Sequence, residues 1–199
     1  MKIYTISKAD GKPDWGCVPA LHVDTVLWAP DCGIRMTQQL CYDETAFYVR
    51  QQAKEPIIRA EHFTPLSPVC EDSCMEFFFS LGADDRYFNF EINPNACFEI
   101  GFGLYRENRI RICHKTEHEA FHPVCKRTLD GWTAEYRIPI EFLRLFYPAY
   151  QLEPGVRFRA NCYKCGDLTV HQHYLSWNPV ETRTPDFHRP EFFGQMLLE

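Results

Sequence analysis

Several segments of the sequence carry polar side chains of the types that recognise sugars. A sugar hydroxyl both donates and accepts hydrogen bonds, so carboxylates, amides and guanidinium groups all pair with it. Successive side chains of a strand point to opposite faces, and the polar residues named below fall on the polar face of their segments. We predict that they share one carbohydrate-binding surface. The alternative is an ordinary solvated sheet face held by arginine–glutamate pairs. The predicted hydrogen-bonding residues are Glu76, Asn89, Glu91, Arg159 and Asn161.

Aromatic residues supply the second requirement for sugar binding. An aromatic ring covers the apolar C–H side of a sugar, because displacing water from that surface is favourable. Trp177 precedes an Asn-Pro pair where a loop begins. We predict that Trp177 stacks on the ligand, since loops often carry function. Trp132 and Trp28 lie in apolar surroundings, and we expect both in the core.

Ten cysteines are present, and their chemistry has two interpretations. Free cysteine packs as a small hydrophobic residue, and Cys113 and Cys162 sit where a strand places an inward apolar side chain; we therefore favour buried thiols. The alternative is a zinc site, because one cysteine pair has the C-x-x-C spacing of a metal knuckle. A knuckle needs a tight turn, whereas Asn-Cys-Tyr-Lys has the character of a strand end. The zinc ligands would be Cys70, Cys74, Cys162 and Cys165.

His171 and His173 are two residues apart, which on an extended segment places both imidazoles on one side. Such a pair suits a metal or haem pocket. Two surface histidines near a strand end are the simpler interpretation.

The carboxylates could also serve as catalytic groups of a hydrolase. Glycoside hydrolysis needs two carboxyl groups that flank the scissile bond, and Glu76, Glu91 and Glu135 are the candidates. No nucleophile elbow, phosphate loop or His-Glu-x-x-His motif occurs. We expect a protein that is not an enzyme, with a hydrolase of O-glycosyl compounds as the alternative.

Charge and composition exclude other classes of partner. The net charge is -6 and no run of Lys or Arg occurs, which disfavours nucleic acid. No segment approaches the ~18 apolar residues of a membrane helix. The first residues lack the regions of a signal peptide, and many cysteines are expected as free thiols. We therefore expect a cytoplasmic protein, or an extracellular one whose signal has been removed.

The elements that position these side chains are predicted from apolar residues that recur at every second position. One-sided alternation is typical of antiparallel sheets, and seven or more such strands indicate two packed sheets. We predict an all-β antiparallel sandwich of the immunoglobulin or jelly-roll type, forming a single domain over 1–199, with one short helix over Ile140–Phe146. The clearest strands are Ile34–Tyr42, Thr45–Gln52, Met75–Ser80, Tyr87–Asn93, Gly131–Ile138 and Val156–Lys164.

Several motifs, in order, resemble those of the carbohydrate-binding family 9 domain and its relatives. Asp72-Ser-Cys-Met-Glu76 is similar to the family's Asp-Ser-x-x-Glu strand. Gly131-Trp-Thr-Ala-Glu135-Tyr-Arg-Ile-Pro139 resembles its Gly-Trp-x-x-Glu-x-x-Ile-Pro segment. The remaining matches are Tyr87–Asn93, Arg159–Tyr163, Ser176–Pro179, Pro185–Pro190 and the closing Phe193-Gly194 strand.

The resemblance implies a β-sandwich that recognises sugars, often attached to or encoded beside a glycoside hydrolase, and it leaves a structural calcium ion open. It implies that Glu76, Asn89 and Glu91 lie where family members contact the ligand. It also implies two tryptophans that clamp a terminal sugar ring. One of these positions falls near Val69 or Cys70, neither of which is aromatic, so the chain departs from the family pattern there. Trp177 and the aromatic loop Phe187 to Phe193 lie in the region of the other, so the resemblance implies that Phe187 belongs to the site.

Overall fold

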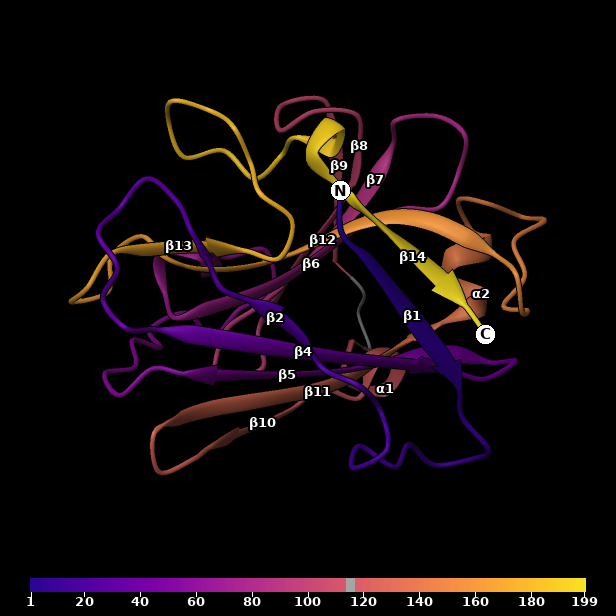
Figure 1. The fold of residues 1–199 in the computed structure, drawn as a ribbon, viewed down its shortest axis with the longest axis horizontal. Helices are drawn as coiled ribbons and strands as arrows, with labels where there is room; N and C mark the ends of the chain where they lie inside the picture. The colour runs from indigo at the N-terminus through magenta and orange to yellow at the C-terminus, as the bar shows by residue number, and fades with distance from the viewer. Residues whose placement is uncertain (114–116) are drawn as a thin grey trace.

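The computed structural model describes residues 1–113 and 117–199 (Figure 1). Within them, no helix combines the length and apolar character needed to cross a bilayer. The helices are α1 (Glu117–Phe121) and α2 (Ile140–Arg144), and short 3₁₀ turns span Val69–Glu71 and Pro190–Phe192. The strands are β1 (Ile3–Lys8), β2 (Leu21–Val23), β3 (Thr25–Val26), β4 (Arg35–Tyr42), β5 (Ala46–Lys54), β6 (Cys74–Ser80), β7 (Tyr87–Ile92), β8 (Phe98–Gly103), β9 (Arg109–Ile112), β10 (Val124–Arg127), β11 (Gly131–Pro139), β12 (Arg157–Gly166), β13 (His173–Ser176) and β14 (Gly194–Leu198).

Alternation of apolar and polar residues located the long strands. The six segments predicted from it are β4, β5, β6, β7, β11 and β12, with ends that differ from the predicted ones by two residues at most. The predicted helix is α2, which begins at Ile140 as expected and ends two residues earlier. Pro139 precedes it with an extended backbone, because proline fits a helix start but not its interior.

The strands form one curled, mixed sheet, so the predicted pair of separate antiparallel sheets is not confirmed. β1 pairs in parallel with β14 through Ile3–Ile6 and in parallel with β4 through Ser7 and Lys8. This one strand therefore joins two arms of the sheet (Figure 1). The first arm runs β4, β5, β11, β10, and the second arm runs β14, β12, β6, β7, β8, β9.

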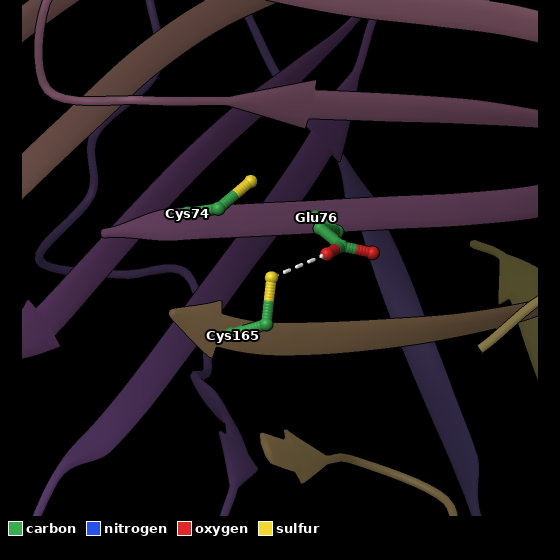
Figure 2. A group of neighbouring side chains, drawn as sticks. All are labelled: Cys74, Glu76 and Cys165. Carbon is green, nitrogen blue, oxygen red and sulfur yellow. Dashed lines mark hydrogen bonds between the residues drawn. The ribbon is translucent and has the colours of Figure 1, made fainter. Parts of the chain in front are cut away.

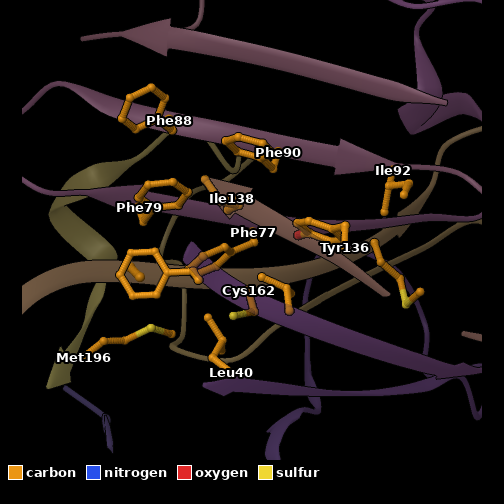
Figure 3. Close-up of a cluster of buried hydrophobic side chains, with 14 of the residues drawn as sticks. Leu40, Phe77, Phe79, Phe88, Phe90, Ile92, Tyr136, Ile138, Cys162 and Met196 are labelled. Carbon is orange, nitrogen blue, oxygen red and sulfur yellow. The ribbon is translucent and has the colours of Figure 1, made fainter. Parts of the chain in front are cut away.

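The two arms pack on each other through an aromatic core (Figure 3). Phe90 of β7 stacks on Tyr136 of β11 with ring centroids 6.3 Å apart, and Phe47 of β5 lies 5.5 Å from Phe158 of β12. Trp132 is fully buried in this core, as predicted. Each ring removes a large apolar area from water, which holds the arms together.

The outer face of the second arm is covered as well, which differs from the predicted wet face. Tyr163 of β12 stacks on Phe187 with ring centroids 4.1 Å apart, and Phe187 belongs to the segment 177–193 that crosses this face. Every residue of β6 and β7 is buried as a result. Alternation within a strand cannot reveal such a cover, because the covering residues come from a distant part of the chain.

A buried ionic cluster lies at one end of β12. The Lys164 ammonium is 3.0 Å from Glu55 Oε2 and 2.8 Å from His173 Nε2, and all three side chains are almost fully buried. Ser73 and Trp132 donate further hydrogen bonds to the Glu55 carboxylate. Burial, and then the nearby Lys164 ammonium, lower the pKa of His173 to about 4. The imidazole is therefore neutral at physiological pH, and its Nε2 accepts a hydrogen bond from Lys164.

We expect His173→Gln to flatten the dependence of stability on pH between about pH 6.5 and 4. In the wild-type protein the unfolded chain protonates His173 below about pH 6.5, whereas the folded protein resists protonation down to a pKa of about 4. The stability is thus complete above pH 6.5 and falls by up to about 3 kcal/mol as the pH is lowered to 4. Urea unfolding at several pH values in this range measures how the free energy of unfolding depends on pH. His22→Gln, at an exposed position of β2, is the control, and an unchanged slope in the His173 variant would contradict the assignment.

Candidate functional site

A cleft of about 460 Å³ opens on the outer face of the second arm, beside the segment that covers the rest of that face. Strands β6, β7, β8 and β9 supply its floor and one wall, and residues 185–188 with Trp28 supply the other wall. The cleft volume lies in the usual range for small-molecule sites.

Three carboxylates form a row across the cleft floor. Glu76 of β6 pairs with Glu91 of β7, and Glu91 pairs with Glu99 of β8, so strand register brings them side by side. Asn89, two residues before Glu91 on the same face, donates a hydrogen bond from Nδ2 to Glu91 Oε1 at 2.9 Å. The predicted residues Glu76, Asn89 and Glu91 are therefore brought together in one cleft.

Burial controls the charge of these carboxyls. It raises the pKa of Glu76 to about 7, and it raises the pKa of Glu91 further above its ordinary value, with repulsion from Glu76 as the second cause. The pKa of Glu99 is also raised by burial, and the Arg111 guanidinium opposes this. A protonated carboxyl both donates and accepts hydrogen bonds, which suits it to a hydroxyl ligand.

Arg109 and Asn89 leave polar atoms without a partner at the floor of the cleft. Arg109 donates from Nη1 to the Tyr87 hydroxyl at 3.0 Å, but among residues 1–113 and 117–199 its Nε and Nη2 have no hydrogen-bond partner. Asn89 Oδ1 also has none in this part of the chain, although it is buried. A Cβ at Gly101 would lie 2.5 Å from Asn89 Oδ1 and 2.8 Å from Arg109 Nε, so glycine keeps both groups in place.

His188 closes this side of the cleft. Its Nδ1 is 2.9 Å from the Tyr87 hydroxyl, and the ring also contacts Arg109 Nη1. Burial, and then the Arg109 guanidinium, lower the pKa of His188 to about 2. The ring is therefore a neutral hydrogen-bonding group.

The aromatic wall consists of Trp28, Phe187 and Tyr174. The Trp28 ring lies 5.3 Å from Phe187 and 5.6 Å from Tyr174, and its Nε1 donates to the Thr182 carbonyl at 2.8 Å. The backbone of Trp28 has φ of 49°, a left-handed conformation that is strained for a bulky residue. Strain of this kind persists where surrounding contacts impose it, and it often accompanies function. Trp28 was expected in the core; its place in the cleft wall corrects that expectation.

The remaining predicted site residues lie in several different places. Trp177 is 4 % exposed, belongs to the aromatic core and packs on Gly194, so the prediction that it stacks on a ligand is wrong. Phe187 is among the residues that line the cleft. Arg159 lines a neighbouring cleft of about 370 Å³, where it pairs with Asp85 at 2.8 Å.

Asn161 lines neither cleft; it fastens the covering segment to the sheet. Its Oδ1 accepts from the Asn178 backbone N–H at 2.9 Å, and its Nδ2 donates to the Asn178 carbonyl at 2.9 Å and to the Phe192 carbonyl at 3.4 Å. A side chain predicted to bind a ligand thus binds the chain's own loop.

The cysteines are not joined by disulfide bonds in the described part of the chain. Cys162 is buried as expected, whereas Cys113 is exposed because it follows the edge strand β9, so the expectation of a buried thiol is wrong there. The four-cysteine zinc set does not converge, because Cys162 faces the aromatic core while Cys165, three residues later, faces the opposite side. Cys70 and Cys165 both line the cleft, and the Cys165 thiol donates to Glu76 Oε1 at 2.9 Å (Figure 2).

The histidine pair does not form one site either. His173 is buried against Lys164, whereas His171 is exposed. The two imidazoles therefore do not meet in one pocket, and the favoured interpretation of two surface histidines is correct for His171 and wrong for His173.

Comparison with known proteins adds sequence and fold evidence. Residues 14–198 match the family model described as carbohydrate-binding family 9. No curated protein matches the chain. A Bacteroides uniformis protein provisionally described as carbohydrate-binding is 26 % identical with a TM-score of 0.85, over 100 % of this chain and 99 % of that one.

Two solved structures come from Caldicellulosiruptor kristjanssonii, and both are described as family 9 carbohydrate-binding modules. The complex with glucose has a TM-score of 0.71 and 14 % identity, over 100 % of this chain and 96 % of that one. The complex with cellotriose has a TM-score of 0.70 and 14 % identity, over 100 % and 94 %. At this identity the likeness establishes the fold alone.

We expect Asn161→Ala to loosen the covering segment. The substitution leaves the Asn178 N–H and the Asn178 carbonyl without this partner, and each buried unsatisfied group costs about 1–3 kcal/mol. The Phe192 carbonyl loses one of its two bonds and keeps the 2.7 Å hydrogen bond from Asn178 Nδ2. Urea unfolding measures the stability, and hydrogen exchange over 178–192 measures the loosening. Gln195→Ala, at a half-buried position of neighbouring β14, should change stability by less than about 0.5 kcal/mol. Equal effects of both substitutions would argue against the fastening role.

Proposed function

The chain belongs to carbohydrate-binding family 9, and on that premise we propose that the cleft on the second arm binds a sugar ring without converting it. One observation carries the proposal. Asn89 Oδ1 and the Nε and Nη2 of Arg109 have no hydrogen-bond partner within the described residues, and they lie at the floor of a cleft with an aromatic wall. Buried polar atoms are nearly always hydrogen-bonded, so these atoms call for a ligand or ordered water.

The two kinds of surface in the cleft match the two kinds of surface on a sugar. Trp28 and Phe187 face the ring's C–H groups, where release of water favours contact. Glu76, Asn89 and Arg109 meet the hydroxyls from the floor, and both carboxylic and carboxylate forms of Glu76 can do so. The paired tryptophans expected from the family resemblance are not both present, since Cys70, at one of their expected positions, lines the cleft without an aromatic ring.

Glucose and short β-linked glucans are the first ligands to test, because family 9 structures of the same fold hold glucose and cellotriose. The family resemblance also favours a role beside a glycoside hydrolase.

The arrangement of carboxylates supports binding rather than hydrolysis. Glu76 and Glu91 are neighbours on one sheet face, so both approach a ligand from the same side. A hydrolase needs its two carboxyl groups on either side of the glycosidic bond. If the wild-type protein released product from an aryl glycoside and Glu76→Gln did not, this assignment would be wrong.

Binding should weaken when either surface is removed. We expect Trp28→Ala and Asn89→Ala each to lower the affinity for glucose or cellotriose by about tenfold or more, a loss of about 1.4 kcal/mol. Isothermal titration calorimetry measures the affinities. Trp15→Ala is the matched control, since Trp15 is half-buried outside the cleft and bonds to Glu135. No sugar binding by the wild-type protein, or equal affinities for the Trp28 and Trp15 variants, would contradict the proposal.

A further inference from the structure

Two thiols and one carboxylate lie close together on neighbouring strands β6 and β12 (Figure 2). Cys74, Glu76 and Cys165 each offer one ligand atom, and these atoms all lie within 4.8 Å of one another. All three side chains are buried. Because all three are buried, they differ from the acidic residues that gather by chance on an exposed surface.

Strand register fixes the positions of these three groups. Cys74 of β6 pairs directly with Cys165 of β12, and Glu76 follows two residues after Cys74 on the same face. All three therefore project from adjacent positions of one hydrogen-bonded sheet. Little rearrangement is needed to bring them around one ion, because the backbone is already held by the ladder.

The cleft gives this cluster access to solvent. Glu76 and Cys165 line the cleft, and so does Cys70, whose carbonyl lies 3.7 Å from Cys165 Sγ. An ion can enter from the cleft, and water or the Cys70 thiol can complete its coordination from that side. An entry path and an open position are what a three-residue metal site requires.

The donor types select the ion. Thiolate sulfur suits Zn²⁺ and other thiophilic cations, whereas Ca²⁺ and Mg²⁺ take oxygen ligands. We propose that Cys74, Glu76 and Cys165 bind a thiophilic divalent cation, with Zn²⁺ as the natural candidate. Each cysteine gives up its thiol proton to the solvent as its sulfur binds the ion, so binding to both releases two protons to the buffer.

This site differs from the set suggested by the cysteine spacing in the sequence. Cys162 belongs to the aromatic core, and Glu76 takes its place as a ligand. The inference deepens the proposed function through a shared residue: an ion held by Glu76 competes with a sugar for the cleft.

Metal titration without sugar tests the site by itself. Reduced, metal-free protein is titrated with Co²⁺, whose thiolate complexes show a sulfur-to-metal charge-transfer band in the near ultraviolet, and Zn²⁺ is then added to displace it. We expect one Co²⁺ per chain with this band, and loss of the band in Cys74→Ser, Cys165→Ser and the double variant. Cys17→Ser and Cys113→Ser, at exposed thiols, are the matched controls and should keep it.

Glu76→Gln keeps the shape of the side chain and provides a variant that preserves both thiols. We expect it to weaken Co²⁺ binding while circular dichroism and urea unfolding stay as in the wild type. No saturable binding to the wild-type protein, or a charge-transfer band that persists in the double cysteine variant, would overturn the proposal. Because no sugar is present, either result leaves the carbohydrate proposal intact, and failure of sugar binding leaves the metal result intact.

Discussion

Asn161 is the contact on which the shape of the cleft depends. Its amide satisfies backbone groups at both ends of the covering segment, at Asn178 and at Phe192. With the segment held there, Phe187 lies flat on Tyr163 and the outer face of the second arm is divided into a covered part and an open part. The polar residues of β6 and β7 would otherwise face bulk water, where their hydrogen bonds to a ligand would compete with solvent.

Burial of the floor has a consequence for the chemistry of the cleft. Burial makes the three carboxyl groups costly to ionise and is the main cause of the raised pKa values of Glu76, Glu91 and Glu99. Repulsion from neighbouring carboxylates adds to it for Glu76 and Glu91. A floor that is partly uncharged can donate as well as accept hydrogen bonds, and the guanidinium groups of Arg109 and Arg111, which also line the cleft, offset part of its negative charge.

The six strands β4, β5, β6, β7, β11 and β12 and three of the floor residues could be predicted from the sequence, because alternation of side chains is a local property. Glu76, Asn89 and Glu91 were placed on one face by parity alone, and register then brought them together. Whether an aromatic ring lies in the core or lines the cleft is not a local property, because contacts with distant residues decide it. The loop after Trp177 predicts an exposed ring, yet the ring packs on Gly194. The apolar neighbours of Trp28 predict a core residue, yet contacts with Phe187 and Tyr174 hold its ring in the cleft wall. Parity also indicates that Cys162 and Cys165 face opposite sides, a constraint that the C-x-x-C spacing conceals.

The parallel pairing of β1 with β14 also bears on how this protein acquires its structure. Ile3 lies opposite Gln195, so the contact closes a loop that includes nearly the whole chain. Such a pairing has the largest entropic penalty of any in the sheet, and topologies rich in distant contacts fold slowly. During synthesis the two arms cannot be joined in this way until the last strand has left the ribosome. Until then the apolar inner faces of both arms depend on shorter-range pairings, and the nascent chain is open to aggregation.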